Sequence, residues 1–462
     1  MILFQGNVYE TKEQELLLSK LYRNIVTTLT KAPLDPHIVI NACHKISKKL
    51  EHGDYSDLLK DYYTGKQSNN NLLTSARVQH QIDDVIRLLD RETLLNKLKR
   101  ELSYDASKPI IKESSDKLKI RSYKRISETP RSARLPLGVL FHIAAGNMEG
   151  LPAYSVIEGL LAGNINILKL PSVDNGITIA ILRELIKEEP VLKNYIYVFD
   201  SPSSEIKTLK RLAKMSNAVV VWGGVEAIKA ARTIADADTK IIEWGHKISF
   251  AYLSKKALYK VLENPDPNTN EMRELKMLAC HIVETKQLQC SSCQGIYLDT
   301  NDKSLQSKFA KLFLTLLEEE AHYHLSPAIQ VKAKITLAQY TDLLEKVKKS
   351  QRIHRGAHTS VTVKKDDTLE TSLTHGNPWI KRLPKHKVIQ KLHHYKGYLQ
   401  TVGLLCMEDE QSSYQQLFAR SGATRIVDLG EMSVIRCEES HDGEYPLQRY
   451  QKIVEFHSDK VL

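Results

Sequence analysis

The chain has 462 residues, of which 42% are hydrophobic, with 20 glycines and 15 prolines, so it can bury a large core in two or three domains and is neither disordered nor fibrous. Its formal charge of +11 comes from 66 basic and 55 acidic residues spread along the chain. No aromatic-interleaved or finger-like module accompanies the basic clusters, so we expect no nucleic-acid binding, whereas a basic surface suits a phosphate-bearing substrate.

Hydropathy and cysteine usage predict a cytoplasmic protein without a membrane span. The most apolar region, 138–170, is interrupted by His142 and three other polar residues, so no stretch reaches the ~20 apolar residues of a spanning helix. Three glutamates in the first 17 residues occupy positions where a signal peptide would be cationic and then apolar. The six cysteines are sparse and irregularly spaced, and we expect them to be free thiols.

The first predicted elements are helical, and the pattern changes after Pro136. Residues 1–131 are polar with apolar residues at helix spacing in 14–22 and 85–98. Beyond them, short apolar runs alternate with helical stretches, which predicts a doubly wound parallel sheet. The expected strands are 138–143, 165–170, 195–199, 218–222 and 240–243, and the expected helices are 152–162, 177–187, 205–215 and 225–235.

A second α/β domain is predicted from Ser249 onward, with a helix at 271–281, a strand at 295–299 and a long helix at 303–320. Residues 354–394 are rich in charge, His and Pro, and we expect loops and irregular strands there. Strand-like runs follow at 398–406 and 431–437, the latter an expected oligomerisation strand. The expected domains are a helical region at 1–130, a cofactor domain at 131–248, a catalytic domain at 249–395 and a C-terminal return segment at 396–462.

The most informative motif is the segment Gln289-Cys290-Ser291-Ser292-Cys293, in the predicted turn between a helix and a strand. A cysteine there can be exposed, with backbone N–H groups that lower its pKa. A Cys-x-x-Cys redox pair and a zinc site are weaker alternatives, because the surroundings are not thioredoxin-like and further ligands are missing. The other four cysteines, Cys43, Cys280, Cys406 and Cys437, are interpreted as inert and buried.

Two polar residues follow predicted strands of the first sheet. Glu243 lies at the carboxyl end of a parallel strand, where ligands bind in open α/β sheets, although such a residue is more often a surface carboxylate. Asn147 lies between a strand and a helix, where its amide can stabilise an oxyanion or simply cap the helix.

The expected cofactor site departs from an ordinary dinucleotide fingerprint, because no Gly-x-Gly-x-x-Gly follows the first strand. Instead the strand at 218–221 runs into Trp222-Gly223-Gly224 and a helix, whose free N–H groups can receive a pyrophosphate. A lone Gly-Gly pair is more often just a turn.

Together these motifs resemble the aldehyde dehydrogenase superfamily, which implies a Rossmann-type cofactor domain, an α/β catalytic domain and a small oligomerisation element. The resemblance implies Cys290 as nucleophile, Asn147 at the oxyanion position and Glu243 as general base. It also implies cofactor contacts at Ala145, Lys169, Ser172, Gly223, Gly224 and Trp244, and no metal site.

More closely, the chain from about Arg131 onward is similar to the acyl-CoA reductase family that includes the fatty acid reductase of bacterial bioluminescence. The similarity is carried by Gly159–Asn164 with Lys169–Ser172, by Cys290-Ser291-Ser292 with Gln294, and by Leu399–Gly403 with Ala423–Val427. Two departures are Cys293 in place of a proline and a glutamine directly before Cys290. Cys293 leaves open a regulatory disulfide or an exchange of roles with Cys290.

The resemblance implies reduction of a long-chain fatty acyl-CoA to the aldehyde through a Cys290 thioester. Ser172 stands where NAD-preferring relatives carry an acidic residue, which predicts NADPH. Implied partners are an acyl-protein synthetase, an acyl-transferase and further copies of the chain. Two alternatives stay open: an aldehyde dehydrogenase in which Glu243 activates water to hydrolyse the thioester, and a non-catalytic scaffold.

Overall fold

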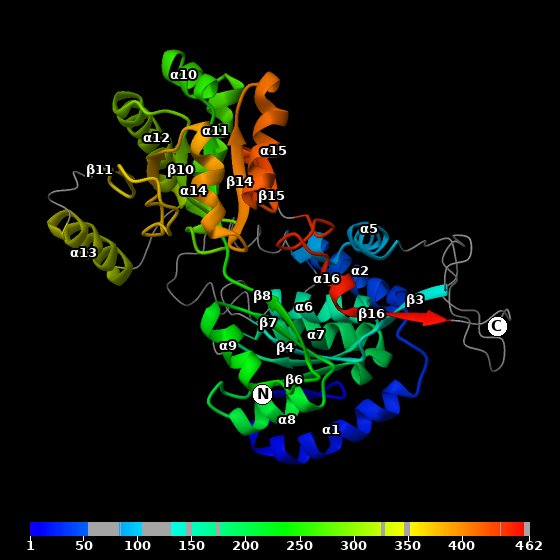
Figure 1. Ribbon diagram of the computed structural model, residues 1–462. Helices are drawn as coiled ribbons and strands as arrows, with labels where there is room; N and C mark the ends of the chain where they lie inside the picture. Colours follow the sequence, from blue (N-terminus) through cyan, green and yellow to red (C-terminus); the bar gives the residue numbers. More distant parts are fainter. Residues whose placement is uncertain are drawn as a thin grey trace. The chain divides into compact units, whose positions relative to one another are not determined.

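The computed structural model in Figure 1 describes residues 1–53, 83, 85–103, 131–144, 150–171, 176–324, 329–345, 352–434 and 436–456. The chain divides into two units, residues 1–245 with 436–462, and residues 246–435. Each unit is built on a seven-stranded sheet with helices packed against it.

The first sheet has the strand order β2-β1-β6-β5-β4-β7-β8, and its last five strands are parallel. This confirms the predicted doubly wound sheet. Because β4 lies between β5 and β7, the winding reverses there, and a crevice opens at the carboxyl ends of such a strand pair. The strands are β4 (Val139–Ile143), β5 (Ile165–Lys169), β6 (Ile196–Phe199), β7 (Ala218–Trp222) and β8 (Lys240–Trp244), and the crossover helices are α6 (Leu151–Leu161), α7 (Ile177–Glu188), α8 (Ile206–Lys214) and α9 (Val225–Ile234).

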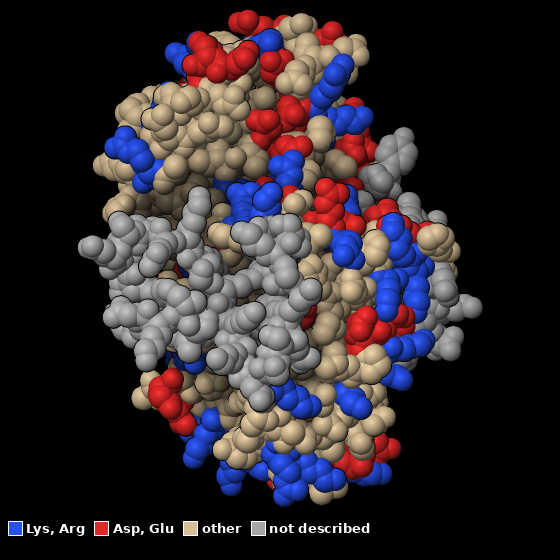
Figure 2. All heavy atoms as spheres, turned by 90° about the vertical axis from the view of Figure 1, so that its right-hand side faces the viewer, with Lys and Arg blue, Asp and Glu red and all other residues tan. Residues whose placement is uncertain are grey.

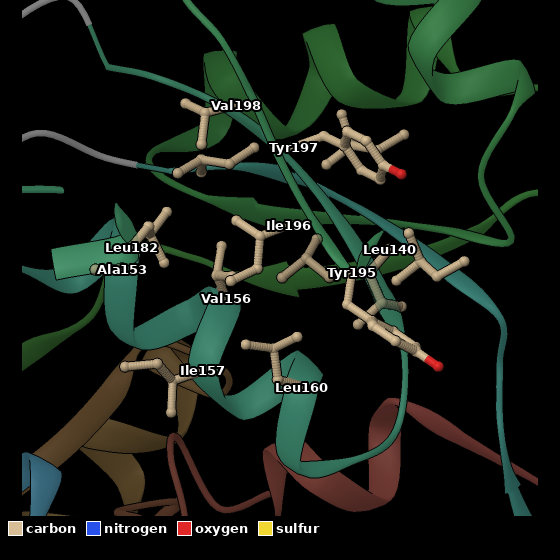
Figure 3. Packing of buried hydrophobic residues seen from close by; sticks show 14 of the residues in the cluster. Leu140, Ala153, Val156, Ile157, Leu160, Leu182, Tyr195, Ile196, Tyr197 and Val198 are labelled. Atoms are coloured by element: carbon tan, nitrogen blue, oxygen red, sulfur yellow. The ribbon is translucent and has the colours of Figure 1, made fainter. Parts of the chain in front are cut away.

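The core of this unit lies between the sheet and its helices. In Figure 3, Val156 and Leu160 of α6 lie opposite Ile196 of β6, and all three side chains are fully buried. The strands read as continuous apolar runs because both faces of a parallel sheet are covered. That is why β4 to β7 could be located from sequence to within one or two residues.

The N-terminus also contributes strands, which the helical prediction for residues 1–131 missed. A hairpin of β1 (Ile2–Phe4) and β2 (Asn7–Tyr9) adds antiparallel to β6. Its two-residue turn, Gln5-Gly6, has φ values of +48° and +81°, as a tight hairpin turn requires. Three residues are too few to show a periodicity. The helices of this region are α1 (Gln14–Leu29), α2 (Pro36–Glu51) and α5 (Arg91–Leu102).

The second unit has the strand order β11-β12-β13-β10-β9-β14-β15, parallel except for the β11–β12 pair. The predicted strand at 295–299 and long helix at 303–320 are confirmed, and residues 352–382 supply three sheet strands. The strands are β9 (Ile248–Leu253), β10 (Cys293–Leu298), β11 (Arg352–Arg355), β12 (Ser360–Val363), β13 (Trp379–Arg382), β14 (Leu399–Leu405) and β15 (Arg425–Asp428). The helices are α10 (Lys255–Glu263), α11 (Asn270–Thr285), α12 (Lys303–His324), α13 (Ile329–Glu345), α14 (Val388–Leu392) and α15 (Gln411–Ser421).

The strand predicted at 431–437 is wrong. Leu429–Ser433 instead forms a short 3-10 helix, because Leu429 and Met432 are buried and the Arg425 guanidinium donates to the carbonyls of Glu431 and Val434 at 3.0 and 2.9 Å. The chain then returns to the first unit through α16 (Pro446–Arg449). Its last strand, β16 (Gln451–Phe456), pairs antiparallel with β3 (Arg131–Pro136).

Charges of both signs are interspersed over the described part of the face drawn in Figure 2, so the net charge forms no single patch there. Among the described helices, none is long and apolar enough to cross a membrane. Within the same residues, no three His, Cys, Asp or Glu side chains gather where they could hold a metal ion.

Candidate active site

Cys290 lies in the predicted position, in the loop between α11 and β10. Helix α11 ends with Lys286 and Gln287 in the left-handed conformation, at φ values of 51° and 59°, which turns the chain sharply toward the sheet. Cys290 is partly exposed, whereas Gln287, Ser292 and Gln294 are all buried. In this loop the thiol of Cys290 is accessible, while the residues on either side of it anchor the loop in the interior.

Two buried glutamines hold this loop. The Gln287 side chain donates to the carbonyl of Cys293 at 2.9 Å and accepts from the backbone N–H of Asn377 at 3.0 Å. Gln294 donates to the carbonyl of Gln287 at 3.1 Å and accepts from the N–H and hydroxyl of Ser372, both at 3.0 Å. Because each amide is bonded at both ends, the two glutamines tie the loop to residues 372–377.

Ser249, at the start of β9, holds the nucleophile position itself. Its hydroxyl donates to the carbonyl of Cys290 at 2.7 Å and accepts from the N–H of Thr401 at 3.0 Å. The Ser249 hydroxyl thus links the backbone of Cys290 to that of Thr401. Because the Cys290 backbone is held in this way, its side chain can approach a substrate carbonyl without rearrangement of the loop. No sequence motif marks Ser249, because its partners lie 41 and 152 residues away in the sequence.

Cys293 has a different environment from Cys290. It begins β10 with no exposed surface, and its thiol donates to the carbonyl of Gly295 at 3.3 Å. Burial raises the pKa of the Cys293 thiol to about 12, so the thiolate needed for attack is scarce at neutral pH. The structure therefore disfavours an exchange of roles with Cys290, and neither of these two cysteines forms a disulfide in it.

His281 lies beneath the loop and was not foreseen. It is 1% exposed, and its Nε2 accepts from the backbone N–H of Cys293 at 3.3 Å. Burial lowers the pKa of His281 to about 4, so the ring is neutral at physiological pH. A neutral ring can accept that bond, whereas a protonated ring cannot.

The predicted pyrophosphate turn follows β7, beside the point where the winding of the first sheet reverses. Gly223 donates to the carbonyl of Trp244 at 3.1 Å, and a Cβ added to it would meet the Ala227 Cβ at 2.8 Å. Gly224 caps α9 without a side-chain hydrogen bond, and a Cβ there would meet nothing within 4 Å. The open space beside Gly224 leaves the N-terminus of α9 accessible, and an accessible helix N-terminus fits a dinucleotide pyrophosphate.

Lys169 ends β5 on the same edge of the sheet. Its side chain is 6% exposed and its ammonium donates to the carbonyl of Leu170 at 3.1 Å. Burial lowers the pKa of Lys169, against the opposing effect of Asp200. Lys169 therefore places a cation at the carboxyl end of a parallel strand, the edge at which ligands bind in open α/β sheets.

Glu243 and Trp244 lie on β8 next to the glycine turn, with Val221 paired to Glu243 and Trp222 to Trp244. The Glu243 carboxylate forms an ion pair with Arg232 of α9 at 2.5 Å and is about 29% exposed. The Trp244 indole is 3% exposed and packs against the ring of Trp222, with centroids 5.5 Å apart. The role of Trp244 at the cofactor stays a prediction.

The return segment supplies residues to this edge that local sequence reasoning missed. The His441 ring lies 4.8 Å from that of Trp222 and 4.9 Å from that of Trp244. Arg449 stacks over Trp244 at 4.7 Å and donates to the carbonyl of Glu243 at 3.2 Å. More than 190 residues separate these partners in sequence, so no local pattern links them.

Three predicted site residues, Ala145, Asn147 and Ser172, lie outside the described residues. The flanking elements are described: β4 ends at Ile143 and α6 begins at Leu151, while β5 ends at Lys169. The proposed roles of the three residues stay predictions.

The profile of the acyl-CoA reductase family LuxC matches residues 32–453, nearly the whole chain. The chain belongs to the LuxC family. This confirms the resemblance found in the sequence and extends it about a hundred residues toward the N-terminus.

Curated relatives of this LuxC-family chain are long-chain acyl-protein thioester reductases. The protein named long-chain acyl-protein thioester reductase 2 of Photobacterium leiognathi is 25% identical over 331 residues, which cover 68% of this chain and 63% of the relative. The Vibrio harveyi reductase is 24% identical, with 69% and 64% covered. The matches thus span less than two thirds of the relatives' length.

Solved structures with the same fold are aldehyde dehydrogenases, which confirms the predicted fold. Succinic semialdehyde dehydrogenase from Streptococcus pyogenes, solved with NADP+, covers 98% of this chain and 97% of its own at a TM-score of 0.66 and 11% identity. The 3,6-anhydro-L-galactose dehydrogenase has a TM-score of 0.62 at 12% identity, with 97% and 92% covered.

Proposed function

We propose that the chain reduces a long-chain fatty acyl thioester, such as fatty acyl-CoA, to the aldehyde with NADPH through an acyl group on Cys290. The observation that carries the proposal is the contrast within one loop, in which Cys290 is partly exposed and Cys293 is fully buried. Family membership and the reductase names of the relatives support the reaction class.

In the first step the Cys290 thiolate attacks the thioester carbonyl, and collapse of the tetrahedral intermediate breaks the bond to the donor's sulfur. The departing thiolate takes up a proton. Asn147 would stabilise the oxyanion, and removal of one such donor typically costs about 10² to 10³ in kcat. Ser249 keeps the Cys290 backbone in place through both steps.

In the second step the acyl carbon on Cys290 becomes a hemithioacetal, which collapses to release the aldehyde and regenerate the thiolate. Bound NADPH supplies the hydride for this reduction. Gly223, Gly224 and the α9 N-terminus would hold the pyrophosphate, with Ala145 and the Trp244 backbone alongside. Lys169 and Ser172 would bind the phosphorylated ribose. Glu243 would carry protons to and from the thiol.

The function is tested with tetradecanoyl-CoA and NADPH, using wild type, Cys290→Ser and Cys293→Ser. We expect aldehyde and NADPH consumption with wild type and Cys293→Ser, and loss of at least 10³-fold in kcat for Cys290→Ser because serine is a far weaker nucleophile. A silent Cys293→Ser with an active Cys290→Ser would overturn the assignment.

One observation supports a second candidate, the hydrolytic aldehyde dehydrogenase reaction. Glu243 is at the edge of the sheet with about 29% of its side chain exposed, so water can reach its carboxylate. A wild type that turns tetradecanal and NADP+ into tetradecanoic acid, and makes no aldehyde from the acyl-CoA, would favour hydrolysis.

A further inference from the structure

Helix α13 (Ile329–Glu345) presents a row of large apolar side chains to solvent. At 3.6 residues per turn, four of them lie within roughly 80° of arc on one side of the helix. Figure 1 shows α13 at the periphery of the second unit. Single exposed apolar residues are ordinary, but several on one helix face indicate a binding surface. We call this row the α13 stripe: Ile329, Leu337, Tyr340 and Leu344 are 79%, 69%, 51% and 75% exposed.

The orientation of the stripe is fixed by contacts on the other sides of the helix. Gln339 is 5% exposed, and its amide donates to the hydroxyl of Ser360 at 2.7 Å and to Asn377 at 3.4 Å. On the stripe itself, Arg355 stacks over the ring of Tyr340 at 4.8 Å. The contacts of Gln339 therefore determine which side of α13 faces solvent.

The anchor leads directly to the nucleophile loop. Asn377, which receives the bond from Gln339, donates its own N–H to the Gln287 side chain at 3.0 Å. Gln287 in turn bonds the backbone of Cys293. Two hydrogen bonds, one to the side chain and one from the backbone of Asn377, thus link α13 to the loop that carries Cys290.

A cavity of about 470 Å³ lies between α13 and strands β11 to β13. Leu337 and Ala338 of the helix, together with Trp379, give it apolar walls, while Thr371 and Ser372 add hydroxyl groups. Ser372 also bonds Gln294. A space with both kinds of wall suits a slender chain that carries amide and methyl groups beside a thioester.

The surroundings of the α13 stripe are basic. Lys332, Lys334, Arg352 and Arg355 are all exposed. An apolar row with a cationic rim fits a partner that has apolar residues within an acidic surface.

We propose that α13 is the docking site of an acidic carrier protein that bears the acyl group as a thioester on a pantetheine arm, and that the arm enters the cavity behind the helix. This rests on the proposed function, and it names the donor. Coenzyme A carries the same arm without a protein. The cavity therefore serves both donors, whereas the α13 stripe serves the carrier protein alone.

The decisive variant is Ile329→Ser/Leu344→Ser, with tetradecanoyl-loaded acyl carrier protein and tetradecanoyl-CoA as donors. Both side chains are mostly exposed, so the fold should be unaffected. We expect kcat/KM to fall at least tenfold with the carrier protein and less than twofold with the CoA ester. The matched control, Tyr22→Ser/Leu29→Ser, removes apolar residues that are 63% and 52% exposed on α1 and should change neither value.

Equal losses with both donors, or none, would overturn the docking site. A change in subunit number on size exclusion, without donor discrimination, would instead assign the α13 stripe to contact between copies. Entry of the pantetheine arm into the cavity is tested with Ala338→Phe, which narrows the cavity and should lower kcat/KM with both donors. Full activity of this variant with both donors would contradict entry of the arm into the cavity.

Failure of the proposed function is distinguishable from failure of docking. If wild type reduces neither donor, the anisotropy of fluorescently labelled tetradecanoyl carrier protein still measures binding. Binding that is at least tenfold weaker in Ile329→Ser/Leu344→Ser supports the docking site. No binding to wild type, or equal binding to both, rejects it.

Discussion

At the residue scale, the candidate site depends on which polar groups are buried. Cys290 and Cys293 are three positions apart and differ in exposure, so only one of them is placed for nucleophilic attack. His281 contributes by staying neutral, since its Nε2 must accept the bond from the Cys293 N–H. The base of the loop therefore carries a proton-sensitive contact.

This contact predicts a dependence of stability on pH. The pKa of His281 is about 4 in the folded chain, because the ring is buried, against about 6.5 when unfolded. Between these values the unfolded chain binds the proton and the folded chain does not, so stability is full above pH 6.5 and falls as the pH drops toward 4. The expected slope is about 1.4 kcal/mol per pH unit.

Urea unfolding of wild type and His281→Gln at pH 7 and pH 5 measures this effect. Gln can accept the same hydrogen bond but does not titrate, so the variant should lose about 2 kcal/mol less than wild type over that range. Identical losses in the two proteins would show that protonation of His281 does not contribute.

At the element scale, the β7–α9 turn uses two adjacent glycines for different reasons. The packing of the protein itself requires glycine at position 223, because a side chain there would collide with Ala227. Gly224 has ordinary backbone angles, with φ −73° and ψ −179°, and open space around it. Neither the backbone angles nor the packing of the turn requires glycine at 224. The missing side chain instead leaves the space that a ligand would need to approach the helix N-terminus.

We therefore expect substitution of Gly224 to weaken cofactor binding and substitution of Gly223 to lower stability. Gly224→Val should change the free energy of unfolding by less than about 1 kcal/mol and raise the KM for NADPH at least tenfold, since the new side chain occupies the path of the pyrophosphate. Gly223→Val should lower the melting temperature. Cofactor titration and thermal denaturation separate the two, and an unchanged KM in Gly224→Val would remove the turn from the cofactor site.

At the scale of the whole chain, a buried ionic group fastens the C-terminal return segment to the first unit. Lys97 of α5 is 2% exposed and forms ion pairs with Glu101 at 2.6 Å and Glu158 at 3.0 Å. It also donates to the carbonyl of Cys437 at 2.9 Å. Burial acts to lower the pKa of Lys97, but the two carboxylates outweigh it and raise the pKa above its ordinary value.

Removing this cation leaves the two buried carboxylates without their counter-charge. Lys97→Met should therefore destabilise the first unit by about 3–5 kcal/mol. Lys99→Met, on the exposed side of the same helix, should cost less than about 0.5 kcal/mol. Chemical denaturation followed by tryptophan fluorescence reports on this unit through Trp222 and Trp244, and equal stabilities for the two variants would contradict the role of the buried group.

The sequence by itself determined the doubly wound sheet, the position of Cys290 between a helix and a strand, the glycine turn after β7 and the family. These features are local: a strand buried on both faces is an apolar run wherever it lies, and a turn needs its own residues. The order of the motifs along the chain was enough to reveal the resemblance.

Only the tertiary structure decided which thiol is accessible, that the Trp244 indole is buried, and that His441 and Arg449 pack against it. It also decided that β1 joins the sheet with three residues and that 429–433 is a 3-10 helix. Burial and pairing depend on contacts between residues far apart in the sequence, and a local pattern carries no record of them. The α13 stripe is the converse case, since its helical spacing is visible in the sequence but its exposure is not.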